Sequence, residues 1–258
     1  MANYHFGVQA ISRGKGRSVV TLANYITGRK LHDRYNDKTY YRQRNDVLYR
    51  GVLQPANAPP GFCDLQYLCD KIDDAENRYD ARTAREFKAS LPNELPLDEQ
   101  IHIVEEFIRD NFIQNGLCAI AAIHRGKNKD DPTRDNPHVH IIIPTRTVGP
   151  DGFSKKKDRE HDKRKYIGIW REQWAFVQNQ AYERNRLDIR VSHESLEVQG
   201  VRDREPTIHL SRIDWQREQR GERTRAGDKK REIKARNREQ EEQRQRRLER
   251  HWQRGRSR

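Results

Sequence analysis

A predicted strand that carries two histidines constrains this chain most. Residues 136–144 read NPHVHIIIP, in which turn-forming residues give way to an apolar, β-branched run that is typical of a buried strand. Residues two apart on a strand point to the same face, so His138 and His140 project together, about 6–7 Å apart along the chain. Two imidazoles at this spacing can contact one metal ion. The alternative is that the pair binds no metal, because two histidines at this spacing also arise by chance in a chain with ten histidines.

A second apolar run, just upstream, supplies a third histidine. Residues 117–123 read LCAIAAI and predict a buried strand that ends in His124. If the two strands pair as an antiparallel hairpin, the polar segment 125–136 connects them, and His124 lies at the same end of the sheet as His138 and His140. Three neutral imidazoles with open positions for a ligand indicate a catalytic metal site rather than a closed structural one.

The N-terminal region predicts a strand over residues 4–12, followed by a basic turn and a short helix that carries Tyr25. Ser18 is a suitable N-cap and Gly28 a suitable residue to end the helix in a left-handed conformation. Tyr25 falls on the flank of the apolar stripe, so its ring can contact the core while its hydroxyl reaches solvent or a site. The alternative is an ordinary tyrosine at the edge of the core.

Arg13, Lys15 and Arg17 precede this helix and suit phosphate, and Arg29 and Lys30 follow shortly after Tyr25. In the turn 13–17, RGKGR, glycines allow backbone amides to approach a ligand, although a flexible basic turn without a ligand has the same pattern. Further along, residues 84–91 predict a strand with an acid, Glu86, inside it. An exposed strand residue is the simplest interpretation of Glu86 taken alone.

The net charge of +13 is unevenly distributed along the chain. Residues 211–258 hold 18 Lys and Arg against 9 Asp and Glu, whereas residues 1–210 are near an ordinary balance. We therefore predict one domain over 1–210 and a basic, charged extension over 211–258, either helical or mobile. The partner expected of such a chain is a polyanion, with nucleic acid favoured over an anionic membrane because the extension has few apolar residues.

The three cysteines show no metal-ligand spacing and suit a reducing compartment better than a disulfide framework. No apolar run is long enough to span a bilayer, and no signal-peptide pattern is present at the N-terminus. These features predict a cytoplasmic protein without membrane insertion.

Taken in order, the motifs of residues 1–210 resemble those of the MobA/MobL (MobQ-type) DNA relaxases, within the class of histidine–hydrophobe–histidine (HUH) nicking endonucleases. The chain departs from the family pattern after Tyr25, where Ile26, Thr27 and Gly28 follow although a basic residue is expected. The matching motifs are ISR (11–13), ANY (23–25), LHD (31–33), AREF (84–87), LPNEL (91–95), His124, NPHVH (136–140), HESL (193–196), REP (204–206) and HL (209–210).

The resemblance implies an α+β fold, with a central antiparallel sheet, helices on its outer faces and a metal at one end. It also implies a single-strand nick at a plasmid origin of transfer, made by Tyr25 as the nucleophile through a 5′-phosphotyrosyl intermediate. His124, His138 and His140 would hold a divalent cation, with Mn²⁺ or Mg²⁺ the first choice and Zn²⁺ or Ni²⁺ as alternatives. Glu86 would support a metal ligand or accept a proton. The cations that flank the nucleophile would hold backbone phosphates of the DNA: Arg13, Lys15, Arg17, Arg29 and Lys30.

The partners implied are DNA that is single-stranded near the nick, together with accessory mobilisation proteins and a coupling protein. A single nucleophilic tyrosine suits conjugative transfer, although Tyr40 and Tyr41 lie near enough to leave a second acceptor open. Two other functions compete with this one. One is a rolling-circle replication initiator or transposase of the same nicking class, and the other is a non-enzymatic basic DNA-binding protein with structural histidines.

Overall fold

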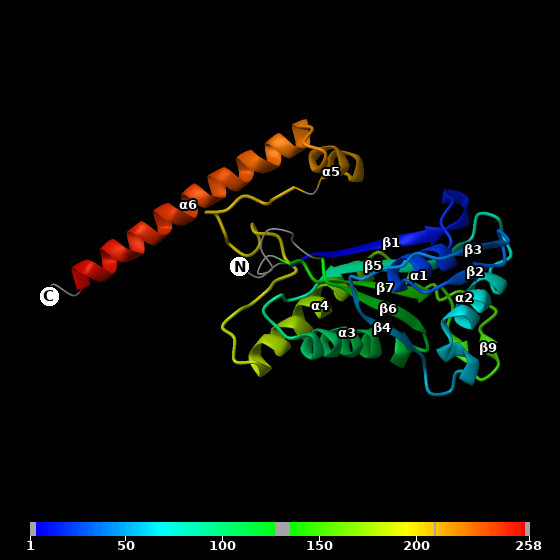
Figure 1. Cartoon of the computed structure of the whole chain (residues 1–258). Helices are drawn as coiled ribbons and strands as arrows, with labels where there is room; N and C mark the ends of the chain where they lie inside the picture. Colours follow the sequence, from blue (N-terminus) through cyan, green and yellow to red (C-terminus); the bar gives the residue numbers. More distant parts are fainter. Residues whose placement is uncertain (1–3, 127–134, 209, 256–258) are drawn as a thin grey trace. The chain divides into compact units, whose positions relative to one another are not determined.

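A computed structural model describes residues 4–126, 135–208 and 210–255, and it is built on a five-stranded antiparallel sheet (Figure 1). This arrangement confirms the predicted α+β class. The two histidine strands lie side by side within the sheet, flanked on both sides by other strands. In spatial order the strands are β1 (Phe6–Ser12), β5 (Arg82–Ser90), β7 (His138–Pro144), β6 (Ala119–His124) and β4 (Val47–Leu53).

Helices cover both faces of the sheet (Figure 1). One face packs against α3 (Leu97–Asn111) and α4 (Lys165–Arg184), and the other against α1 (Val19–Thr27) and α2 (Leu65–Asp74). Connections contain the hairpins β2 (Leu31–Asp33) with β3 (Lys38–Tyr40) and β8 (Val148–Gly149) with β9 (Gly152–Phe153), and the short 3₁₀ helices η1 (Arg13–Lys15), η2 (Pro60–Cys63) and η3 (Ile113–Asn115).

Side chains along the central strands point alternately to the two faces of the sheet, so the core has two parts, one on each face. On β6, Ala121 and Ile123 pack toward α3 and α4, whereas Ile120 and Ala122 pack toward α1 and α2. Because side chains two apart share a face, His124 continues the row of Ile120 and Ala122. The three histidines therefore project from the face of the sheet that α1 covers.

Local sequence accounts for both ends of α1. The Ser18 hydroxyl accepts hydrogen bonds from the backbone N–H groups of Val20 and Thr21, as the N-cap prediction requires. At the other end Gly28 has φ 66°, and its N–H donates to the carbonyl of Asn24. A side chain is disfavoured in this left-handed conformation, so glycine ends the helix directly after the turn that carries Tyr25.

Residues 187–191, which follow α4, form no strand. This segment is held to α4 by a side chain instead. Asn179 donates its amide to the carbonyl of Val191 and accepts the Val191 N–H, so the segment obtains backbone partners without a neighbouring strand.

The chain divides into two compact units, 1–193 and 194–258. The second contains α5 (Arg212–Gln219) and α6 (Arg225–Gly255), which gives the predicted charged extension its helical form. Within this unit Glu205 forms an ion pair with Arg236 and its backbone N–H bonds to Asn237, so the unit includes residues before 211. The functional boundary at 210 stays a prediction.

Most of the loop expected between the histidine strands, residues 127–134, lies outside the described residues. Within the described part of the chain, no helix has the length and apolarity needed to cross a membrane.

Candidate metal centre and nucleophile

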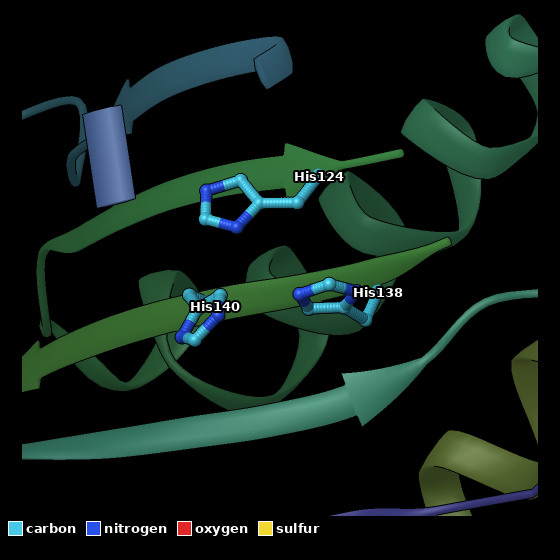
Figure 2. Close-up of side chains that lie close together, drawn as sticks. All are labelled: His124, His138 and His140. Atoms are coloured by element: carbon cyan, nitrogen blue, oxygen red, sulfur yellow. The ribbon is translucent and has the colours of Figure 1, made fainter. Parts of the chain in front are cut away.

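The hairpin brings the three histidines together as its pattern predicts. His124 of β6 lies directly opposite His138 of β7, and His140 follows two residues later on the same face (Figure 2). The ring centroids lie 4.8 to 5.4 Å apart. One nitrogen from each ring can be chosen so that all three lie within 4.8 Å of one another. Nitrogens bound to one ion at about 2.1 Å are at most about 4.2 Å apart, so a small closing movement would bring all three to an ion.

Each ring has a fixed orientation, because one of its nitrogens is already bonded to an oxygen. His124 donates through Nε2 to the backbone carbonyl of Ile26 at 2.7 Å. His138 donates through Nδ1 to the carbonyl of Asn136 at 2.8 Å. His140 donates through Nδ1 to Oε1 of Glu86 at 3.1 Å. The remaining nitrogens, Nδ1 of His124 and Nε2 of the other two, are those that would face an ion.

The chemistry of these nitrogens fits a metal. Nδ1 of His124 is fully buried and has no hydrogen-bond partner among the described residues. An unpaired buried polar atom is costly, and a bound cation would supply its missing partner. Burial is also the main reason why the pKa of His124 is lowered to about 4 and that of His138 is lowered as well. Both rings are thus held in the neutral form that binds metal.

Gly126 permits the contact that orients His138. It has φ 60°, and a Cβ at this position would overlap the backbone carbonyl oxygen of Asn136. That carbonyl is the acceptor for Nδ1 of His138. Any larger residue would push the two sides of the loop apart, so we infer that Gly126 is required for the ring orientation. Sequence reasoning missed this residue, although a glycine two positions after a histidine strand is a visible signal.

Tyr25 lies beside the three histidines. Its ring centroid is 6.1 Å from that of His140 and 6.4 Å from that of His124, and the residue is 37% exposed. The Tyr25 side chain therefore contacts the histidine rings and is still accessible to solvent. The bond from His124 to Ile26 joins a histidine strand to the residue that follows Tyr25, so the helix and the histidine cluster are held in register.

Two arginines that sequence reasoning did not select flank Tyr25. The guanidinium carbons of Arg42 and Arg44 lie 5.1 and 4.7 Å from the centre of the Tyr25 ring. Arg44 also donates to the Tyr25 backbone carbonyl at 3.1 Å and is paired with Asp46. These arginines supply the positive charge that the family pattern led us to expect directly after the tyrosine. Only the tertiary fold reveals them, because they lie 17 and 19 positions away in a polar segment.

Four different groups hold the last four backbone carbonyls of α1. Gly28 donates to Asn24, Arg44 to Tyr25, His124 to Ile26 and Arg50 to Thr27. These are the carbonyls that a helix end leaves without partners of its own. Tyr25 thus lies in a helical turn in which all four backbone carbonyls accept hydrogen bonds.

Glu86 is buried, not exposed as its strand pattern alone suggested. Its side chain is 1% exposed, and it accepts from Nδ1 of His140 at 3.1 Å, from Arg17 at 2.6 Å and from Gln9 at 2.7 Å. Burial by itself would raise the pKa of this carboxyl. The hydrogen bonds from His140 and Arg17, together with the charge of Lys88, outweigh that effect and lower the pKa to about 2. Glu86 is therefore an anion that orients His140.

The five cations predicted to bind DNA fall into two groups. Arg13 and Arg17 have partners inside the protein, since Arg13 pairs with the carboxylate of Asp73 at 3.0 Å and Arg17 pairs with Glu86. By contrast, Lys15, Arg29 and Lys30 are exposed. The DNA contacts of all five stay predictions, and the exposed three are the better placed to make them.

The lowered pKa values predict how stability depends on pH. The unfolded chain protonates His124 near its ordinary pKa of 6.5, whereas the folded chain resists protonation down to about 4. Between these values the unfolded state binds more protons, so lowering the pH favours unfolding. We expect the free energy of unfolding of the metal-free protein to fall by a few kcal/mol as the pH is lowered from about 6.5 toward 4.

Urea unfolding followed by circular dichroism in EDTA would measure this fall. A His138→Gln variant should show a shallower fall, because it removes one of the groups that take up a proton on unfolding. A free energy of unfolding that stays constant or rises over this range would contradict the assignment of buried neutral imidazoles.

Comparisons with known proteins agree on one family. The sequence profile of the MobA/MobL family matches residues 17–220. A probable mobilization protein MobA of Bifidobacterium longum is 31% identical over 81% of this chain and 43% of its own length. A conjugal transfer protein TraA of Agrobacterium fabrum is 30% identical over 81% of this chain and 21% of its own length. This chain thus spans less than half the length of these curated relatives.

A solved structure shows the same fold. It is described as the molecular basis of vancomycin resistance transfer in Staphylococcus aureus, and it matches with a TM-score of 0.67 and 27% identity. The match covers 74% of this chain and 98% of the solved one.

Proposed function

Because this chain belongs to the MobA/MobL family, we propose that it is a relaxase that nicks one DNA strand at a plasmid origin of transfer. The reaction is a transesterification, and the nucleophile is Tyr25. The observation that carries the proposal is the position of a solvent-accessible tyrosine ring, 6.1 Å from His140 and 6.4 Å from His124, beside three histidines oriented to bind one cation.

The reaction begins with the Tyr25 hydroxyl, which attacks the scissile phosphorus. A bond forms between the tyrosine oxygen and phosphorus, and the bond from phosphorus to the 3′ oxygen breaks. The phenolic proton is lost to solvent, and the released 3′ oxygen takes up a proton from solvent. The products are a 5′-phosphotyrosyl link and a strand with a free 3′-hydroxyl. The bond energy of the phosphodiester is kept in the link, so the strand can be rejoined. Arg42 and Arg44, over the ring, place positive charge beside the nucleophile, where the phosphate of the strand would approach.

His124, His138 and His140 would hold a divalent cation through Nδ1, Nε2 and Nε2. When bound, it would supply positive charge to the non-bridging phosphate oxygens as charge develops in the transition state. The donor set of three imidazoles accepts Mn²⁺, Zn²⁺ or Ni²⁺ readily, and Mg²⁺ with less preference. The chain itself orients the three imidazole rings, because each donates a hydrogen bond to Ile26, Asn136 or Glu86 without an ion being needed.

The hydrogen bonds of Glu86 support a positioning role rather than that of proton acceptor. Both carboxylate oxygens already accept hydrogen bonds, one from His140 and the other from Arg17 and Gln9. A carboxyl whose pKa is lowered to about 2 is also a weak base.

The proposed substrate is DNA that is single-stranded around the nick. The exposed cations Lys15, Arg29 and Lys30 would contact its backbone, and the basic extension would add affinity that falls with salt. We further propose that accessory mobilisation proteins and a coupling protein act with the enzyme during transfer.

A covalent adduct tests this function directly. The protein would be incubated with single-stranded DNA from the candidate transfer origin, with Mn²⁺ or with EDTA, and the products separated on a denaturing gel. We expect a protein–DNA adduct with Mn²⁺ only, and mass spectrometry of the digested adduct should find the DNA on the peptide that contains Tyr25. Cleavage without an adduct would indicate a hydrolytic nuclease instead, and binding without cleavage would indicate a DNA-binding protein.

The positioning role of Glu86 predicts a loss of metal affinity. In a Glu86→Gln variant the acceptor of Nδ1 of His140 becomes neutral, and Arg17 loses its counter-charge. Since a partner of this kind is worth about 10- to 100-fold in metal affinity, we expect Mn²⁺ binding measured by calorimetry to weaken by this factor. Nicking at saturating Mn²⁺ should recover much of its rate, whereas a proton acceptor would leave affinity unchanged and lower the rate at every concentration. Glu105→Gln is the matched control, because Glu105 bonds to Tyr49 on the opposite face of the sheet.

A further inference from the structure

A pocket of about 390 Å³ adjoins the end of α1 that follows Tyr25. Thr27 lines it, two residues after the nucleophile, together with the edge strand β4 and the start of α2. Its lining includes the apolar residues Val52 and Leu65 and the charged residues Arg29 and Asp64. We call this cavity the β4 pocket. A volume of this size falls in the range of pockets that bind small organic groups.

The β4 pocket opens on the same face of the sheet as the metal centre. Ile120, which also lines the pocket, and His124 are four residues apart on β6, so their side chains share a face and lie about 13 Å apart along the strand. A DNA strand whose scissile phosphate meets Tyr25 could therefore reach the pocket within a few nucleotides.

The chemistry of the β4 pocket suits a nucleotide. Arg29 and Arg50 contribute two guanidinium groups, and no described carboxylate forms an ion pair with either of them. This contrasts with Arg13, Arg17 and Arg44, whose charges are matched inside the fold. The partly exposed apolar side chains of Val52 and Leu65 can pack against a flat ring, while a guanidinium can bind phosphate or the acceptor atoms of a base. The carboxylate of Asp64 disfavours phosphate at its own wall and suits the amino group of a base.

We propose that the β4 pocket receives one unpaired nucleobase of the DNA strand beside the scissile phosphate, an inference that rests on the proposed function. The base ring packs on Val52 and Leu65. Its polar edge faces Asp64, and the flanking phosphate faces Arg29. The pocket thereby reads one position of the origin sequence and fixes the register in which the strand meets Tyr25.

The chain contains its own reporter for this proposal. Cys63 lines the β4 pocket and is exposed, whereas Cys69 and Cys118 are buried. Burial raises the pKa of both buried thiols, so a maleimide should react with Cys63 far faster than with the other two. Occupation of the pocket should slow that reaction.

The test uses Tyr25→Phe protein, which leaves the strand intact, and single-stranded oligonucleotides from the candidate origin. Maleimide labelling of Cys63 would be followed by mass spectrometry, and binding by fluorescence anisotropy, for a series in which each nucleotide near the nick is made abasic in turn. We expect the intact strand to slow labelling about 10-fold, and one abasic position to restore the rate and weaken binding by about 10-fold.

The Arg29→Ala variant provides a second measurement. It should weaken binding of the intact strand and reduce the penalty at the same abasic position, whereas Arg109→Ala, on α3 beyond the opposite face of the sheet, should do neither. Protection that is equal for every abasic strand, or full binding with no protection of Cys63, would overturn the pocket proposal while leaving nicking by the wild type intact. Absence of both binding and nicking on a verified origin would instead overturn the proposed function.

Discussion

Replacing Tyr25 with phenylalanine is expected to abolish the covalent protein–DNA adduct and to reduce nicking by at least about 1,000-fold, because the only change is the loss of the attacking oxygen. The phenyl ring can keep its contacts with His124, His140 and the two arginines, so the fold and the binding of DNA should be retained. Adduct on a denaturing gel measures the chemistry, and fluorescence anisotropy measures binding.

Tyr41→Phe is the matched control, since Tyr41 is 67% exposed and lies in the same part of the chain. It should form adduct at the wild-type rate. The nucleophile assignment is wrong if Tyr25→Phe still forms adduct and either Tyr40→Phe or Tyr41→Phe does not. In that case the nucleophile is whichever of Tyr40 and Tyr41 is required for the adduct.

Removing a histidine of the cluster is the other change with a large expected effect. In His140→Ala the cation would lose one of three protein ligands, and Glu86 would lose the hydrogen bond from His140. Loss of a group that hydrogen-bonds to a metal ligand costs about 10- to 100-fold in metal affinity, so loss of the ligand itself should cost more than about 100-fold. Nicking at limiting Mn²⁺ should fall by at least the same factor. Calorimetry with Mn²⁺ and the adduct assay would measure the two effects.

His102→Ala, on the exposed side of α3, is the control for the loss of a histidine as such. Thermal unfolding of both variants in EDTA separates loss of metal from loss of fold. Normal Mn²⁺ affinity in a folded His140→Ala protein would mean that the three histidines are structural, as the competing sequence interpretation holds.

The histidine hairpin could be predicted because its signals are local. An alternating strand pattern fixes which side chains share a face, and an apolar run that ends in a histidine predicts that His124 lies at the same end of the sheet as His138 and His140. The structure adds the register, in which His124 lies opposite His138. The ends of α1 were predictable for the same reason, since Ser18 and Gly28 act on backbone groups a few residues away.

What the sequence did not reveal depends on contacts between distant segments. An exposed strand residue was the simplest interpretation of Glu86 taken alone, yet it is buried against Arg17 and His140, which come from other elements. The sequence also did not reveal that Arg13, which is predicted to contact DNA, forms an ion pair with Asp73, 60 positions away. Arg42 and Arg44 meet Tyr25 only because the chain returns to α1 after the β2–β3 hairpin. Charge patterns along a chain do not say which charges are already paired in the fold.

The hydrogen bonds at the end of α1 have a mechanical consequence. In the proposed reaction a DNA strand would be joined to Tyr25, and any force on that strand would be applied to the turn of helix that carries the residue. Because the four carbonyls of that turn are held separately by Gly28, Arg44, His124 and Arg50, the load is divided among four attachments, three of them side chains from outside the helix. The cleaved end would then be held by the sheet as a stiff anchorage, still aligned with the centre where a returning 3′-hydroxyl must attack.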